Sequence, residues 1–139
     1  MKISVVFWSQ SGNTAAMADA VGQGITEAGK EAEVIEVSSA SLDVLKEEKA
    51  FALGCPAMGS EVLEESEMEP FVAEVEAIAA GKKIGLFGSY GWGDGEWMRT
   101  WEESAGNAGA ILACDSVMAN EEPDDEAKTA CRNLGQTLA

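Results

Sequence analysis

Short apolar segments alternate with segments of helical spacing along the whole chain, and this alternation constrains the fold more than any other feature. The apolar segments, which we predict to be strands, are residues 3–7, 32–37, 50–54, 82–88 and 110–118. The stretches that follow them carry apolar residues three or four apart and predict helices or helical turns at 14–28, 38–49, 70–81, 96–108 and from 123 onward. Strands that are apolar on both faces form parallel sheets with helices on each side. We therefore predict an α/β fold, a doubly wound five-stranded parallel sheet covered on both faces.

The length of the chain leaves room for one such unit. With 139 residues, of which 46% are hydrophobic, we expect a single domain over residues 1–139, without a linker or an internal repeat. No apolar run is long enough to span a membrane, and the N-terminus begins with a strand rather than a signal peptide. These features predict a soluble, cytoplasmic protein without a membrane partner.

The charge balance narrows the range of partners. Asp and Glu number 25 against nine Lys and Arg, the formal net charge is −16, and the chain contains no His. Such a surface disfavours nucleic acid, attracts basic protein surfaces and favours a monomer, although the acidity also simply keeps the protein soluble. The three cysteines, Cys55, Cys114 and Cys131, form no CxxC pair, which indicates reduced thiols. The absence of His and of clustered Cys argues against a zinc or transition-metal site. The absence of His excludes a Ser-His or Cys-His nucleophile pair.

The loop after the first strand predicts an anion site. Residues 8–14 read WSQSGNT, so hydroxyls, an amide and one glycine lie between a strand and a helix. The backbone N–H groups of a helix N-terminus, together with the helix dipole, bind anions and most often phosphate. The alternative is an ordinary turn, in which Ser, Asn and Thr serve only as helix caps. No basic residue occurs in the unusual loops before Arg99, so neutral donors would have to hold the phosphate.

Two further loops carry unusual residues, and in this fold they end at the same edge of the sheet, where ligands bind. The loop after residue 54 contains Ala57-Met58-Gly59-Ser60-Glu61, with a thioether, a glycine and a carboxylate. The loop after residue 88 reads SYGWGDG and places Tyr90 and Trp92 between glycines, free to stack on a planar ring. Singly, Met58 could fill a gap in the core and a loop aromatic could pack under its own loop. Together the loops favour a ligand with a phosphate at one end and a planar ring at the other.

The sequence lacks residues that three other classes of phosphate-binding or phosphorylated protein require. The first loop lacks the lysine of GxxxxGK[ST], which excludes a P-loop nucleotidase, and it is not GxGxxG, which argues against a dinucleotide site. A phospho-receiver domain needs acidic residues after the first strand and an Asp at the end of the third. Trp8, Ser9 and Cys55 stand there instead.

The three loops resemble those of the flavodoxin family, in the short-chain type of anaerobic bacteria. SQSGNT at 9–14 fits the family's [ST]-x-[ST]-G-x-T phosphate loop, and LGCPAMGSE at 53–61 and GSYGWGDG at 88–95 resemble its two flavin loops. No long insertion interrupts the last strand, and the resemblance covers the whole chain. It implies the strand order 2-1-3-4-5 and non-covalently bound FMN.

The resemblance also implies roles for individual residues. It assigns the FMN phosphate to Ser9, Gln10, Ser11, Gly12, Asn13 and Thr14, helped by Ser89. It places the isoalloxazine ring between Met58 and Trp92, and gives Glu61 the hydrogen bond from flavin N3–H. The peptide of Gly59-Ser60 would turn its carbonyl toward flavin N5 on reduction. The remaining residues expected to contact the cofactor are Ala57, Tyr90, Gly91 and Gly93. Pro56 departs from relatives with Ser at this position, which leaves open a weaker hold on the phosphate.

The implied function is electron transfer at low potential, one electron at a time, between the neutral semiquinone and the anionic hydroquinone of FMN. Such a protein is a carrier for other enzymes and not itself an enzyme. Its expected partners are basic-faced redox proteins, reductases or oxidoreductases, that dock at the flavin edge. The alternative is an FMN-dependent small-molecule reductase of the quinone type on the same fold. The chain lacks the inserts and the acid-base pair that such an enzyme would need.

Overall fold

The computed structural model describes residues 2–9, 12–58, 63–91 and 95–139. Its strands are β1 (Lys2–Phe7), β2 (Glu31–Glu36), β3 (Ala50–Gly54), β4 (Lys83–Tyr90), β5 (Ile111–Leu112) and β6 (Val117–Asn120). Its helices are α1 (Asn13–Glu27), α2 (Leu42–Glu47), α3 (Met68–Glu76), α4 (Glu96–Asn107) and α5 (Asp125–Leu138), with a short 3-10 helix at Val37–Ser39. Most of these elements begin and end within a few residues of the predicted ones.

The sheet has the predicted topology. The strands lie in the order β2-β1-β3-β4-β5, all neighbours are parallel, and β6 also pairs with β4. In register, Val5 lies beside Val34 on one side and Ala52 on the other. Because the chain moves outward from β1 in both directions, the order reverses between β1 and β3. A doubly wound sheet binds ligands beyond the carboxyl ends of its strands at this point.

The last predicted strand, 110–118, is present as two pieces. β5 pairs with Lys83 and Ile84 at the start of β4, whereas β6 pairs with residues from Phe87 to Tyr90 at its end. Residues 113–115 of the connection form bends, and Ser116 follows them directly before β6. Asp and Ser favour turns because their side chains bond to nearby backbone. The predicted single strand is therefore one interrupted strand that continues beyond residue 118.

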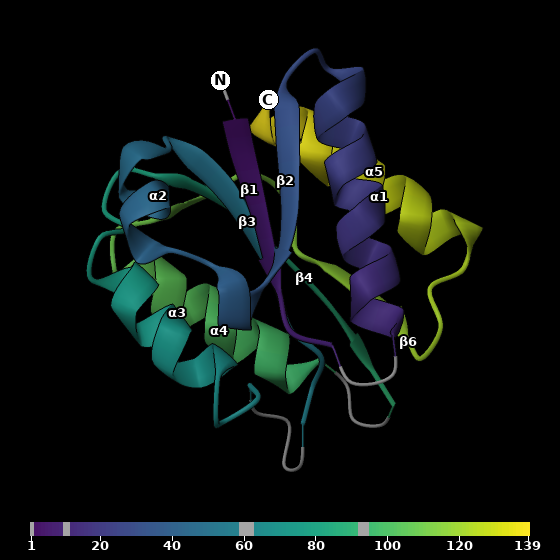
Figure 1. The fold of residues 1–139 in the computed structure, drawn as a ribbon. Helices are drawn as coiled ribbons and strands as arrows, with labels where there is room; N and C mark the ends of the chain where they lie inside the picture. The colour runs from purple at the N-terminus through teal and green to yellow at the C-terminus, as the bar shows by residue number, and fades with distance from the viewer. Residues whose placement is uncertain (1, 10–11, 59–62, 92–94) are drawn as a thin grey trace.

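Two hydrophobic cores lie on opposite faces of the sheet. Figure 1 shows α1 and α5 on one face and α2, α3 and α4 on the other. Fully buried Val21, Ile25 and Leu134 belong to the first core, and Phe51 and Trp101 belong to the second. Every central strand contributes to both cores, which explains why these strands are apolar throughout.

Helix α3 is shorter than predicted. Pro70 lies in its first turn, as expected, because a proline there loses no helical hydrogen bond. The helix ends at Glu76 rather than near Gly81, and its buried face is formed by Met68, Val72 and Val75. Among the described residues, no helix combines the length and the hydropathy that crossing a bilayer requires.

Candidate functional site

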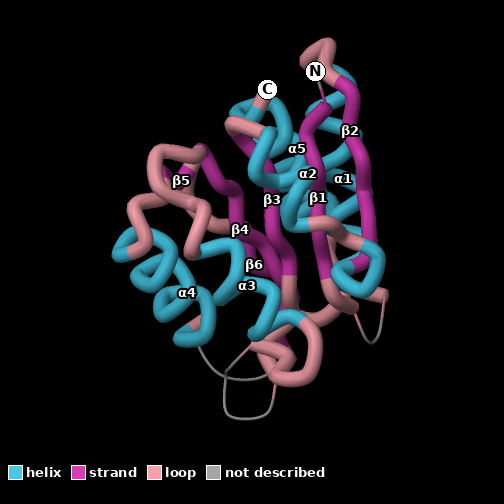
Figure 2. The backbone as a smooth tube through the Cα atoms, turned by 60° about the vertical axis from the view of Figure 1, so that its left-hand side comes forward, coloured by secondary structure: helices cyan, strands magenta, loops and turns pink. Residues whose placement is uncertain are grey.

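Backbone hydrogen bonds bring the ends of β1, β3 and β4 together at the carboxyl edge of the sheet. The N–H of Trp8 donates to the carbonyl of Gly54 at 3.0 Å, which joins the first loop to the second. The N–H of Ala57 donates to the carbonyl of Ser89 at 2.9 Å, which joins the second loop to the third. Figures 1 and 2 show this edge opposite the end that holds both chain termini. The described parts of the three loops thus lie together at one edge of the sheet, which is the place that the strand topology predicts for them.

The first loop turns into α1 through a glycine with a left-handed backbone. Gly12 occupies the N-cap position with φ 93° and ψ −7°, a conformation that favours glycine. The hydroxyl oxygen of Ser9 accepts the N–H groups of Gly12 at 3.1 Å and Ala15 at 3.3 Å. The Ser9 hydroxyl therefore holds the turn together through these two bonds. The N-cap residue, Gly12, has no side chain that could cover the helix N-terminus.

Two buried hydroxyls meet where α1 begins and β4 ends. Thr14 Oγ1 and Ser89 Oγ are 3.1 Å apart, and the residues are 1% and 5% exposed. One hydroxyl donates to the other, and the accepting hydroxyl keeps its own proton for an oxygen above the helix N-terminus. Hydroxyls and backbone N–H groups at a helix N-terminus suit an anion, and a phosphate in particular. The described residues therefore fit the phosphate end of the expected ligand.

The second loop lies against β4 because Gly88 has no side chain. A Cβ at Gly88 would stand 2.1 Å from the carbonyl oxygen of Cys55. The same carbonyl accepts the indole Nε1–H of Trp97 at 3.2 Å, so Cys55 is held from two sides. Burial raises the pKa of the Cys55 thiol to about 12, which keeps it protonated and unreactive at neutral pH. Ala57 and Met58 follow, and both are half-buried.

The far end of the second loop is held by a buried carboxylate. Glu64 is 7% exposed and accepts the N–H groups of Ser66, Glu67 and Met68 at 2.7 to 3.0 Å, together with the Ser66 hydroxyl. These groups lie at the N-terminus of α3, so Glu64 acts as its cap. Its own N–H donates to Cys55 Sγ at 3.4 Å, which ties the two ends of the loop together.

The hydrogen bonds decide the pKa of Glu64. Burial alone would raise this pKa, but the Ser66 hydroxyl and the N–H groups of Met68, Ser66 and Glu67 lower it to about 2. The side chain is therefore negatively charged at neutral pH, at the end of the second loop where α3 begins. The role of Glu64 as a cap is missing from the sequence prediction. The available signal was an acid a few residues before the apolar Met68.

Replacing Glu64 with glutamine should lower the free energy of unfolding at neutral pH by about 2 kcal/mol, because hydrogen bonds to a charged acceptor are stronger than those to an amide. The folded pKa of about 2 lies below the ordinary value of 4.5, so the stabilisation is present above pH 4.5 and is lost as the pH falls toward 2. Urea unfolding at neutral pH and at low pH measures it. The matched control is E65Q at an exposed neighbour; an equal effect in both variants would contradict the role of Glu64.

The third loop begins later than predicted. Ser89 and Tyr90 belong to β4 and pair with Ala119 and Asn120 of β6, because the interrupted last strand resumes alongside them. The Tyr90 ring is half-buried and packs on Trp97, with centroids 5.6 Å apart and an angle of 47° between the planes. The Tyr90 ring is thus packed against Trp97 of α4 rather than standing free in the loop, whereas Gly91 is exposed.

A tryptophan connects the first loop to α3. Trp8 is half-buried, and its Nε1–H donates to Glu67 Oε1 at 3.3 Å.

Several predicted site residues lie outside the described part of the chain, namely Gln10, Ser11, Gly59, Ser60, Glu61, Trp92 and Gly93. The described ones are Ser9, Gly12, Asn13, Thr14, Ala57, Met58, Ser89, Tyr90 and Gly91, and all lie at this edge. Within the described ranges, no group of His, Cys, Asp or Glu is arranged to hold a metal ion.

Comparison with known proteins identifies the family. The family described as Flavodoxin matches residues 5–135. The chain is 46% identical to a flavodoxin of Clostridium beijerinckii, with 99% of each chain covered, and 40% identical to one of Megasphaera elsdenii, covering 99% of this chain and 98% of the other.

Solved structures agree with these matches. The two-electron reduced Megasphaera elsdenii flavodoxin superposes with a TM-score of 0.90, covering 99% of this chain and 98% of the other. A flavodoxin from the domain Archaea, 34% identical, gives 0.88, covering 100% and 96%. With the sheet order, the three loops at one edge and full-length relatives in agreement, the chain belongs to the flavodoxin family, in its short-chain form.

Proposed function

We propose that the carboxyl edge of the sheet binds FMN through the three loops and exchanges single electrons at low potential with other proteins. As a member of the flavodoxin family, the chain is an FMN-binding electron-transfer protein and not an enzyme. FMN supplies the redox chemistry, and the protein supplies binding, orientation and electrostatics. The observation that best supports the proposal is the buried Thr14–Ser89 hydroxyl pair above the N-terminus of α1.

The proposed phosphate site combines the first loop with the end of β4. Its residues are Ser9, Gln10, Ser11, Gly12, Asn13, Thr14 and Ser89. The N-terminus of α1, whose cap residue Gly12 has no side chain, and the hydroxyl pair support this assignment, since both favour an oxyanion without a countercharge. Pro56 has no N–H to donate, so the phosphate would depend on these groups.

The proposed ring site lies between the second and third loops. We assign Met58 and Trp92 to its two faces, Glu61 to the N3–H hydrogen bond and the Gly59-Ser60 peptide to the N5 position. The other residues proposed to contact the ring or its chain are Ala57, Tyr90, Gly91 and Gly93. The bond from Ala57 to Ser89 supports a ring site next to the phosphate site, because it joins the two loops directly.

Negative charge at the end of the second loop and over the whole chain supports a low potential. Glu64 stays ionised at every physiological pH, Glu67 lies at the start of α3, and the chain carries a net charge of −16. Each surface charge acts only weakly through solvent, but charges of one sign add. An opposing free energy of about 1.4 kcal/mol lowers a one-electron potential by about 59 mV.

The role implies redox partner proteins, and we propose that these present basic surfaces to the flavin edge. The acidic residues of α3 and the segment before it support this proposal, namely Glu64, Glu65, Glu67, Glu69, Glu74 and Glu76. We further propose a monomer that works in the cytoplasm as one domain over 1–139. Unpaired Cys55, Cys114 and Cys131 support a reducing compartment.

Electron transfer to a basic partner should slow steeply with added salt, because screening removes the attraction between the surfaces. Stopped-flow measurement of the second-order rate constant from low to physiological ionic strength should show a fall of about tenfold or more. A rate constant that does not change with salt would contradict docking by charge.

The binding part of the proposal is tested by comparing FMN with riboflavin. Riboflavin has the same ring and lacks the phosphate. We expect apoprotein to bind FMN at least about 100-fold more tightly, from two or more hydrogen bonds to a charged group. Quenching of flavin fluorescence gives both dissociation constants. Equal affinities would overturn the phosphate site, and failure to bind FMN at all would overturn the proposal.

A further inference from the structure

A lysine-lined groove crosses the amino edge of the sheet, opposite the flavin site. Lys2, Lys30, Lys49 and Lys83 line it, which is four of the nine basic residues in a chain with 25 acidic ones. The groove has a volume of about 630 Å³. It lies at the end of the molecule where both chain termini are marked in Figure 1. We call it the lysine groove.

The floor of the lysine groove is apolar. Ile3 of β1 and Leu138 of α5 line it and are 7% and 3% exposed, and Ala50 at the start of β3 lines it as well. Val44 on α2 is one of the exposed large apolar side chains, at 37%. A ring of ammonium groups over an apolar floor matches an amphipathic anion better than a bare inorganic one.

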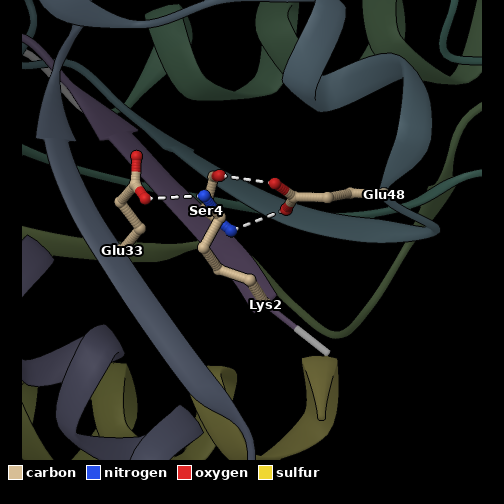
Figure 3. Close-up of polar contacts among 4 residues, drawn as sticks. All are labelled: Lys2, Ser4, Glu33 and Glu48. Carbon is tan, nitrogen blue, oxygen red and sulfur yellow. Dashed lines mark hydrogen bonds and ion pairs between the residues drawn. The ribbon is translucent and has the colours of Figure 1, made fainter.

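One lining residue of the groove, Glu48, is a buried acid whose carboxylate accepts hydrogen bonds within the protein. The carboxylate of Glu48 is taken up by Ser4, whose N–H donates at 2.7 Å and whose hydroxyl donates at 2.6 Å (Figure 3). Lys82 Nζ donates to the carbonyls of Lys46 at 2.9 Å and Glu48 at 2.6 Å, which fixes the connection from α2 to β3. Glu48 also lines the groove, but it is 8% exposed and both of its carboxylate oxygens accept hydrogen bonds from Ser4.

The lysines keep donors for a ligand. Lys2 pairs with Glu33 at 2.7 Å (Figure 3), and Lys83 donates to the carbonyl of Thr137 at 3.3 Å. Each ammonium has three protons, so both retain donors. Within the described ranges, neither Lys30 nor Lys49 has an acceptor.

An alternative explanation is that the lysines only neutralise the negative C-terminal end of α5. This explanation does not account for all four lysines and the apolar residues below them. A cation near the C-terminus of α5 is favourable, and the bond from Lys83 to Thr137 fits this role. It explains neither Lys49, which makes no such bond, nor the apolar floor below it. Glu47, Glu48 and the C-terminal residue Ala139 also line the groove and oppose an anion, and Lys2 is already paired with Glu33. The attraction for an anion therefore comes mainly from Lys30 and Lys49, whose ammonium groups have no acceptor within the described ranges.

We propose that the lysine groove binds an organic carboxylate with an aliphatic body. The carboxylate contacts Lys49 and Lys30, and the aliphatic part covers Val44 and Leu138. This site is separate from the flavin edge, so it stands or falls independently of FMN binding.

The test is an NMR titration of the FMN-loaded protein with octanoate, acetate and octanamide. Acetate carries the charge without the body, and octanamide carries the body without the charge. We expect octanoate to shift groove amides saturably, with a dissociation constant of about 1 mM or below, and the other two to bind at least about tenfold more weakly. Equal binding of acetate or octanamide would overturn the proposal, as would octanoate shifts confined to the flavin edge.

Variants identify the groups that contact the ligand. Lys49→Glu should weaken octanoate binding about tenfold, whereas K128E on the exposed face of α5 makes the same charge change away from the groove and should alter it less than about twofold. V44S should weaken it several-fold by removing apolar floor, and E47Q should tighten it. Equal effects of K49E and K128E would show attraction by general charge and overturn the site.

Discussion

The variant Gly88→Ala is expected to unfold at clearly lower urea concentration and to bind FMN at least tenfold more weakly. The added Cβ would stand 2.1 Å from the carbonyl oxygen and 3.0 Å from the carbonyl carbon of Cys55, and 3.2 Å from Cζ2 of Trp97. Backbone atoms cannot move aside as a flexible side chain can, so β4 or the second loop has to shift. Overpacking of this kind costs about 3 kcal/mol of stability.

The same shift would damage the ligand site. Ala57 follows Cys55 by two residues, and its bond to the Ser89 carbonyl joins the second and third loops. Urea unfolding and FMN fluorescence quenching measure both effects. G106A is the matched control: a Cβ at this exposed position in α4 meets no atom within 4 Å. It should leave FMN binding unchanged and stabilise the helix by about 0.5–1 kcal/mol. Equal stability of G88A and G106A would contradict the close packing at Gly88.

The variant Thr14→Val should weaken FMN binding about 10- to 100-fold while the fold persists. Valine keeps the shape of threonine but removes the hydroxyl that meets Ser89 Oγ at 3.1 Å. The Ser89 hydroxyl then loses its partner in a buried position, and the hydrogen bond that orients the pair's one free proton toward the phosphate is lost. A hydrogen bond to a charged group contributes about 1.5–3 kcal/mol, which sets the range.

A second threonine of α1 provides the control for Thr14→Val. Thr26 bonds its hydroxyl to the Gly22 carbonyl at 3.1 Å, far along the same helix from the site. T26V removes the same atoms and should leave the FMN dissociation constant within about twofold of the parent. Titration of apoprotein with FMN measures both variants. If T14V bound FMN as tightly as T26V, the hydroxyl pair would have no part in holding the phosphate.

The arrangement of strands was predictable because each core strand is apolar on both faces, as a covered parallel sheet requires. The break in the last strand was not predicted. Asp115 and Ser116 are two polar residues inside an otherwise apolar run, and whether such a pair interrupts a strand depends on its neighbours. In the structure Ser116 donates to Glu102 of α4 at 2.7 Å, a contact between distant parts of the chain.

The position of the candidate site could be predicted from the sequence, but most of the contacts that hold its loops in place could not. The three loops follow strands whose ends must share an edge, so their convergence follows from topology. The groups that hold the loops could not be found from sequence spacing. Trp97 reaches back to Cys55, and Glu64 bonds both to Cys55 and to the start of α3. Such contacts depend on tertiary packing between segments.

An anaerobic redox titration of the purified holoprotein, followed by absorbance, tests the central claim most directly. The spectrum identifies the flavin, and its changes count the electrons taken up in each step. We predict a yellow protein whose FMN is reduced in two resolved one-electron steps, the second at a potential below that of free FMN. Reduction in one two-electron step at the potential of free FMN, or a protein that holds no flavin, would contradict the account.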